Sequence, residues 1–235
     1  MADALTFFLA AVAVWRVRER APSRAPASSV WPVLRNRRFL LASIAQALLS
    51  LSTVVLTLTL PLWIISRSVA PAWVIGTLLA GSTVLAVSLQ VPMSKFAVTP
   101  AGATRSSWTA GLLLAAGCSA FAFTDGASVP WAIALLTVGA VLRLLGELLQ
   151  AASGWTMSFS APPAGRASTY QAIYSTAFTA AAAIGPLLSG WVVTQPQGRG
   201  WFGAAAFFAC AGVVAAASGA AVMRYRPRTR GPTRK

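Results

Sequence analysis

Long runs of apolar residues, separated by short polar stretches, dominate the pattern of the chain. A helix that crosses the roughly 30 Å hydrocarbon core of a bilayer needs about 20 apolar residues. Runs of this size predict helices at Phe39–Ile65, Trp73–Pro92, Ser107–Thr124, Pro130–Gly154, Tyr170–Thr194 and Trp201–Met223. The connections between them are short and contain the glycine, proline and polar residues that are typical of turns. The pattern therefore predicts an all-α membrane protein with a bundle of six transmembrane helices.

A shorter apolar stretch occupies residues 1–15. About 14 residues at 1.5 Å each reach roughly 21 Å, which is too short to cross a bilayer alone. A signal peptide carries positive charge before its apolar part, whereas here Asp3 comes first and Arg16 follows. We therefore expect a partial helix, the end of a preceding transmembrane helix, at 1–15. It is followed by a basic cytoplasmic linker at 16–38, the six-helix domain at 39–223 and a basic tail at 224–235.

Composition and charge support a membrane environment. Of the 235 residues, 57% are hydrophobic and 10% are charged, whereas a soluble domain has about 25% charged residues. The net charge is +15, and 16 of the 19 basic residues fall in the two ends or in loops on one predicted side. Only Arg67 and Arg199 fall in loops on the other side. Because positive loops mark the cytoplasmic side, we expect a multi-pass cell-membrane protein with both termini in the cytoplasm, and no nucleic-acid partner.

The residues needed for common kinds of catalysis are missing. Histidine is absent, and the two cysteines, Cys118 and Cys210, lie inside apolar runs. This excludes metal sites with histidine ligands, Ser-His and Cys-His catalysis, and a disulfide framework. No aspartate lies inside a predicted span, which also excludes a pair of intramembrane aspartates. The sequence therefore argues against an enzyme, and no cofactor or metal is expected.

Arg143 and Glu147 are the only charged residues well inside a predicted span. On the insertion scale each costs about 2.5–3.5 kcal/mol at the middle of a helix, so we expect neither to face lipid. They lie four residues apart on one helical face and can pair, and Gln150 extends that face. Two interpretations stay open. Glu147 takes up and releases a proton while Arg143 tunes its proton affinity, or the two residues form a structural ion pair.

A polar stripe on the first span and two aromatic residues on the fifth are further candidates. Gln46, Ser50, Thr53 and Thr57 recur at steps of four, three and four residues, so they share one helical face. This face can line a wet cavity or contact another helix, or its hydroxyls can bond to carbonyls of their own helix. Tyr174 and Phe178 are spaced four residues apart; aromatic rings in a cavity would bind flat, apolar, often cationic compounds.

Small residues and tryptophans suggest how the spans pack and where they end. Small side chains recur every four residues along the fifth span, at Ala177, Ala181, Gly185 and Ser189, which predicts a close approach to another helix. Tryptophans lie near the predicted span ends at Trp63, Trp73, Trp108, Trp131, Trp191 and Trp201. Because tryptophan is enriched at the membrane interface, we interpret these residues as interface anchors.

Short motifs follow one another along the chain. They are Arg35-Asn-Arg-Arg-Phe39, Leu145-Gly-Glu-Leu-Leu149, Pro162-Pro-Ala-Gly-Arg166, Tyr170-Gln-Ala-Ile-Tyr174 and Ile184-Gly-Pro-Leu-Leu-Ser-Gly190. With six spans and both ends inside, this order resembles the C-terminal half of multidrug-efflux transporters of the major facilitator superfamily (MFS). The loop after the second span departs from the family's Gly/Asp/Arg-rich turn: Gly102 and Arg105 match it, but no aspartate is present.

The resemblance implies half of an MFS fold and a proton-coupled efflux transporter for small apolar or cationic compounds. In such transporters the substrate lies near the midplane between two halves, so a homodimer or a missing N-terminal half is expected as partner. Glu147 and Arg143 are then the proton-coupling candidates. Substrate-cavity candidates are Gln46, Ser50, Thr53, Thr57, Gln150, Tyr174 and Phe178. The alternative is a truncated, non-transporting membrane protein or an assembly partner of a separate half.

Overall fold

The computed structural model describes residues 30–160 and 166–224, and every regular element in these two stretches is helical. The elements are α2 (Trp31–Leu34), α3 (Arg37–Leu49), α4 (Ser52–Val54), η1 (Val55–Thr59), α5 (Leu60–Ser66), α6 (Trp73–Ser94), η2 (Lys95–Ala97), α7 (Pro100–Ala122), α8 (Val129–Ser160), α9 (Ala167–Thr194), η3 (Pro196–Gly198) and α10 (Arg199–Arg224). The all-α prediction is confirmed for these residues. The predicted partial helix at 1–15, most of the linker and nearly all of the tail lie outside them.

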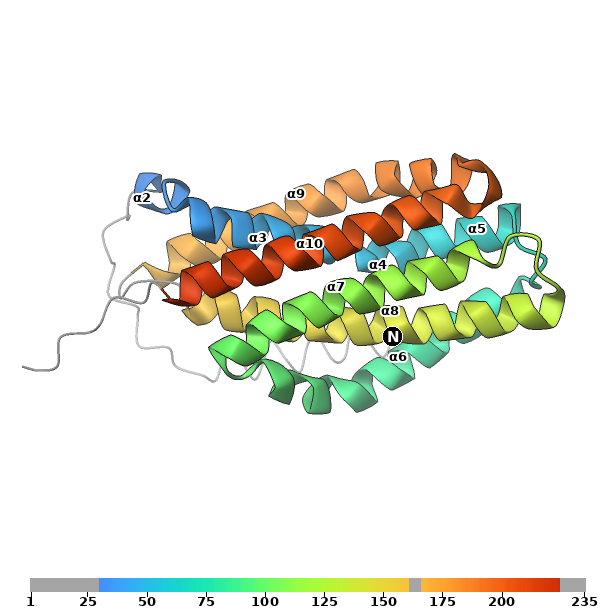
Figure 1. Cartoon of the computed structure of the whole chain (residues 1–235), viewed down its shortest axis with the longest axis horizontal. Coiled ribbons are helices and arrows are strands. Elements are labelled where there is room, and N and C mark those ends of the chain that lie inside the picture. The colour runs from blue at the N-terminus through green and yellow to red at the C-terminus, as the bar shows by residue number, and fades with distance from the viewer. Residues whose placement is uncertain (1–29, 161–165, 225–235) are drawn as a thin grey trace, which may run out of the picture.

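The long helices alternate in direction along one axis (Figure 1). As a result, α2 and the last turn of α10 lie at the same end of the bundle. Five segments are long and apolar enough to cross a membrane: Arg37–Ser66, Trp73–Ala97, Val129–Phe159, Ala167–Thr194 and Pro196–Met223. Length and composition therefore suggest a membrane-spanning protein.

The remaining long helix, α7, is not among these five segments because polar residues such as Arg105, Ser106 and Ser107 lie in it. A span was predicted from Ser107, but the helix begins seven residues earlier. Thr99 caps it by accepting a hydrogen bond from the Gly102 N–H at 3.0 Å. Pro100 takes the first helical position, where its missing N–H costs nothing.

Glycines let α7 pack tightly between α8 and α10. A Cβ atom built on Gly111 would lie 2.6 Å from the Cα of Gly212 on α10. A Cβ atom on Gly117 would lie 2.8 Å from the carbonyl oxygen of Gly139 on α8. Because no larger side chain fits at these crossings, the backbones approach closely, as membrane helices with small residues at their interface do.

Two tryptophans predicted as interface anchors lie instead in the core. Trp63 and Trp201 are both fully buried, with ring centroids 5.9 Å apart in a T-shaped pair. Phe121 also packs against Trp201, with ring centroids 5.0 Å apart, and the Trp63 indole N–H donates to Thr124 Oγ1 at 2.8 Å. The prediction was wrong for these two residues because partners on α7 and α10 cover rings that sequence position alone places near a span end.

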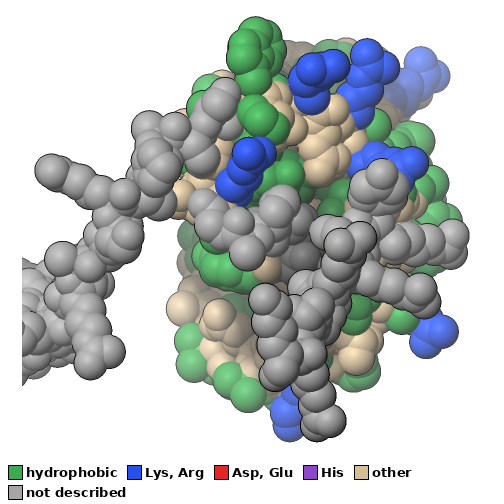
Figure 2. All heavy atoms as spheres, turned by 90° about the vertical axis from the view of Figure 1, so that its left-hand side faces the viewer, with side chains coloured by type: hydrophobic (Ala, Val, Ile, Leu, Met, Phe, Trp, Pro, Cys, Tyr) green, Lys and Arg blue, Asp and Glu red, His purple; other side chains and the backbone are tan. Residues whose placement is uncertain are grey.

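Most basic residues of the described stretches gather at one end of the bundle. Figure 2 looks onto this end, where Lys and Arg side chains are visible and Asp and Glu are not. The residues concerned follow α2, open α3, follow α6, lie in the first turns of α7 and precede α9: Arg35, Arg37, Arg38, Lys95, Arg105 and Arg166. Arg67, which follows α5, and Arg199, the first residue of α10, lie at the opposite end. The charge asymmetry predicted from the loops is therefore also an asymmetry in space.

Candidate functional site

The first long helix is interrupted twice, although the sequence predicts one continuous span. After α3 ends at Leu49, the N–H groups of Thr53 and Val54 bond to carbonyls only three residues back, at 3.1 and 3.0 Å. A π-helical turn, η1, then precedes α5. Pro61 lies in the first turn of α5; it has no N–H to donate and its ring crowds the carbonyl four residues earlier, which accounts for a wider turn there.

An ion pair on α8 faces this irregular segment. Arg143 Nη1 donates to Glu147 Oε2 at 2.5 Å and to the Ser52 carbonyl at 3.0 Å. Thr53 Oγ1 donates to the other carboxylate oxygen of Glu147 at 2.7 Å. The Arg143 side chain is 2% exposed and that of Glu147 is 26% exposed. The carboxylate is therefore held from two helices while part of it still reaches the surface of the bundle.

The polar groups around Arg143 are incompletely satisfied. Within the described residues, Arg143 Nε and Ser52 Oγ are buried without a hydrogen-bond partner, and Glu147 is the only acid in an ion pair with this guanidinium. A buried charge is costly unless it is paired and hydrogen-bonded. The charge of Arg143 is therefore compensated mainly by one carboxylate that is itself accessible.

Gln46 and Gln150 lie in a buried hydrogen-bond network that joins α3, α7 and α8. The Gln46 amide nitrogen donates to Ser107 Oγ at 2.9 Å and to Ser153 Oγ at 3.3 Å. Gln150 donates to the side-chain and main-chain oxygens of Gln46 at 3.2 and 3.3 Å. Gln46 is fully buried and Gln150 is 3% exposed. The structure thus places both glutamines in the buried contact between helices.

Ser107 and Ser153 belong to this network, although the sequence did not single them out. Ser153 follows Gln150 by three residues on α8, so the same helical face could have revealed it. Ser107 is brought in only by the packing of α7, and no local spacing points to it. The network is a tertiary feature that one polar stripe does not predict.

The four side chains of the predicted polar stripe on the first span therefore make different contacts. Gln46 enters the buried network and Thr53 binds Glu147. Ser50 Oγ instead donates to the Ala47 carbonyl at 2.7 Å, and Thr57 Oγ1 donates to the Thr53 carbonyl at 2.9 Å. Two of the four side chains thus bond to carbonyls of their own helix.

Tyr174 and Phe178 on α9 lie together beside the network. Their ring centroids are 4.7 Å apart, and both side chains are partly buried. The Tyr174 hydroxyl approaches the backbone of Gly154 on α8, where a Cβ atom would overlap it and would lie 3.5 Å from Gln46 Oε1. Because Gly154 has no side chain, the Tyr174 hydroxyl can reach the edge of the buried network.

The small residues of α9 pack against the irregular part of the first helix, as their spacing predicts. Ala181, Gly185 and Ser189 are buried. A Cβ atom on Gly185 would lie 2.7 Å from a methyl carbon of Val54, and Ser189 Oγ and Thr59 Oγ1 are 2.7 Å apart. The segment that holds Glu147 is thus enclosed between α8 and α9.

The chemistry available at this site is proton exchange and binding through rings and hydroxyls. In the described ranges, no three His, Cys, Asp or Glu side chains come together in a way that could hold a metal ion. No family model, curated protein or solved structure matches the chain. The function has to be inferred from the geometry of the site itself.

Proposed function

We propose that the chain is one half of a secondary active transporter in which Glu147 takes up and releases the coupling proton. The observation that carries the proposal is the position of this carboxylate. It is partly exposed, paired with a buried arginine, and hydrogen-bonded to a helix that is interrupted at the point of contact. Ionisable groups inside membrane helices commonly mark ion pathways and proton relays.

Protonation of Glu147 would change the contact between α8 and the first long helix. A neutral carboxyl no longer compensates Arg143, which keeps its charge and retains the Ser52 carbonyl as its other hydrogen-bond acceptor. The loss of charge pairing favours an arrangement in which the guanidinium finds other partners. Because Ser52 and Thr53 lie between a tight turn and a π-helical turn, this is the part of the helix that can rearrange most easily.

The substrate is proposed to be a small apolar or cationic compound, exported from the cytoplasm across the cell membrane. Tyr174 and Phe178 offer stacking and cation–π contacts. The basic end of the bundle is assigned to the cytoplasm by the positive-inside rule. A second six-helix unit, either another copy or an N-terminal half, completes the cavity in this proposal, as the resemblance to MFS transporters implies.

The test is to measure substrate binding and proton release separately. The full chain in lipid nanodiscs is titrated with a fluorescent lipophilic cation in weakly buffered solution, while a pH dye reports released protons. We expect binding with proton release for the native chain, and binding without proton release for Glu147→Gln. Asp125→Asn is the matched control, because Asp125 lies in the α7–α8 connection outside the ion pair. It should release protons like the native chain.

Two results would contradict the proposal. If Glu147→Gln abolishes cation binding as well as proton release, Glu147 is not a separate coupling group. If the native chain binds the cation and releases no proton, the pair is structural. The second result favours the alternative, a non-transporting membrane protein, for which the full burial of Arg143 is the supporting observation.

A further inference from the structure

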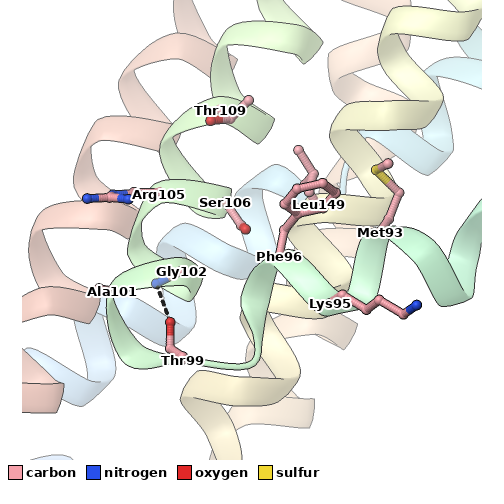
Figure 3. Close-up of a pocket in the computed structure, with 10 residues that line it drawn as sticks. All are labelled: Met93, Lys95, Phe96, Thr99, Ala101, Gly102, Arg105, Ser106, Thr109 and Leu149. Atoms are coloured by element: carbon pink, nitrogen blue, oxygen red, sulfur yellow. Dashed lines mark hydrogen bonds between the residues drawn. The ribbon is translucent and has the colours of Figure 1, made fainter.

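A hollow of about 610 Å³ opens at the basic end of the bundle, away from the ion pair. The end of α6, the η2 turn and the first turns of α7 surround it, and Leu149 of α8 closes its floor (Figure 3). Met93, Phe96 and Leu149 give it an apolar interior. Lys95 and Arg105 flank it, with their charged ends extending to opposite sides.

The hollow is held in shape by specific contacts. Thr156 Oγ1 on α8 donates to the Ala97 carbonyl at 2.8 Å and fixes η2 against α8. Thr99 caps α7 through the Gly102 N–H. A Cβ atom on Gly102 would overlap the Phe96 carbonyl and lie 2.9 Å from Thr99 Oγ1, so only glycine permits this tight turn. The walls are therefore set by packing and hydrogen bonds.

Ser106 gives the hollow a polar group that lacks a partner. It is 4% exposed, its side chain points toward Phe96 in Figure 3, and its hydroxyl makes no hydrogen bond within the described part of the chain. Among the described residues, the Ser106 oxygen is not one of the fully buried atoms that lack a partner, so it is accessible. A ligand that brings a polar group to this depth can hydrogen-bond to it.

The charges around the hollow favour the binding of an anion. Lys95 and Arg105 are both exposed beside the hollow, and the N-terminus of α7 adds its partial positive charge. The two acidic residues of the described stretches lie elsewhere: Asp125 is in the connection at the opposite end, and Glu147 binds Arg143 on α8. No described acid lies at this end; the only opposing charge described beside Lys95 is the partial negative charge at the C-terminus of α6.

We infer that this hollow binds one anionic phospholipid of the bilayer, with the headgroup attracted to its rim by Lys95 and Arg105 and the start of an acyl chain in the apolar interior. A free phosphate would match the cations but would leave apolar surface uncovered, including Phe96, which is 62% exposed. Basic pockets between transmembrane helices on the cytoplasmic side are suited to anionic headgroups. The inference requires a membrane-embedded bundle and is independent of transport.

The first test removes the charges. The full chain is reconstituted in nanodiscs of phosphatidylcholine with phosphatidylglycerol, and the anionic lipid that it retains on extraction is counted by native mass spectrometry. Each cation near a membrane surface contributes a factor of about five in affinity, so Lys95→Gln/Arg105→Gln should weaken retention by about 25-fold. Arg67→Gln/Arg199→Gln removes two cations from the opposite end and should leave retention unchanged. Equal losses in the two double variants would mean diffuse attraction and would overturn the inference.

The second test fills the hollow while keeping both charges. Thr109→Trp places a large ring in it, whereas Ala116→Trp is a matched control two turns along on α7, and both positions are exposed. We expect loss of phosphatidylglycerol retention for Thr109→Trp alone. Retention that survives Thr109→Trp and is displaced by millimolar inorganic phosphate would show a simple anion site and would overturn the lipid assignment.

Discussion

Removing Glu147 should lower the free energy of unfolding more than removing Arg143 does. Arg143 is 2% exposed and Glu147 is 26% exposed. Glu147→Gln leaves a buried guanidinium without its carboxylate, and breaking a buried pair in this way costs about 3–5 kcal/mol. Arg143→Met leaves a carboxyl group that is still hydrogen-bonded to Thr53 and that, unlike a guanidinium, can become neutral by taking up a proton. The cost of lost hydrogen bonding is then about 1–2 kcal/mol.

The assay is reversible unfolding of the full chain in mixed detergent micelles, followed by helical circular dichroism. The free energy of unfolding is measured for the native chain, both single variants and Arg143→Met/Glu147→Gln. In the double variant no charge is left unpaired, so it should be more stable than Glu147→Gln alone. Because the two residues are in contact, the coupling energy of this cycle should be clearly non-zero. The double variant also supplies a folded chain without this carboxyl for the proton-release experiment.

The reasoning is refuted if Arg143→Met destabilises the chain as much as Glu147→Gln, or if the double variant is the least stable of the four. Either result would mean that Arg143 contributes through its packing and the Ser52 hydrogen bond. Compensation of its charge by Glu147 would then be unimportant. Glu147→Asp serves as a control for shape: it keeps the charge, and its loss of stability should fall well below that of Glu147→Gln.

Two further pairs of substitutions, each a test with its control, probe the packing of the bundle by the same unfolding assay. Gly111→Ala should destabilise the chain by about 1–3 kcal/mol because the new methyl group meets the backbone of Gly212. Gly81→Ala on α6 meets nothing within 4 Å and should be neutral or stabilising by up to about 1 kcal/mol; equal losses would exclude a steric cause. Trp63→Phe should cost about 1–2 kcal/mol through loss of the indole hydrogen bond. Trp73→Phe, at a residue that is 61% exposed, should cost nearly nothing.

The sequence predicts what depends on local spacing and misses what depends on distant partners. The four-residue step between Arg143 and Glu147 predicts their pairing, and the small residues around Gly185 predict a close helix contact. The bond from Thr53 to Glu147 joins residues 94 positions apart, so no local pattern contains it. Pro61 signals an irregular helix, but the break after Leu49 follows from hydrogen bonds that the sequence does not show.

The buried tryptophans also show that local sequence does not reveal packing against distant residues. Trp63 and Trp201 lie near predicted span ends, a position that favours the membrane interface. Their burial depends on Phe121, which packs against Trp201, and on Thr124, which accepts the hydrogen bond of Trp63. The polar character of α7 is misleading in the same way. Its serines and glycines lower its hydropathy, yet they are the residues that let it fit between α8 and α10.

Helix α8 contacts the first long helix on both sides of the break after Leu49. Before the break, Gln150 binds the main-chain and side-chain oxygens of Gln46 in a network that does not titrate. Beyond it, Arg143 and Glu147 bind Ser52 and Thr53 through a contact that depends on one ionisable carboxyl. Under the proposed function, a proton on Glu147 therefore weakens only the second contact. The bundle would then bend at the break, with α3 held on α8 while the π-helical turn and α5 move.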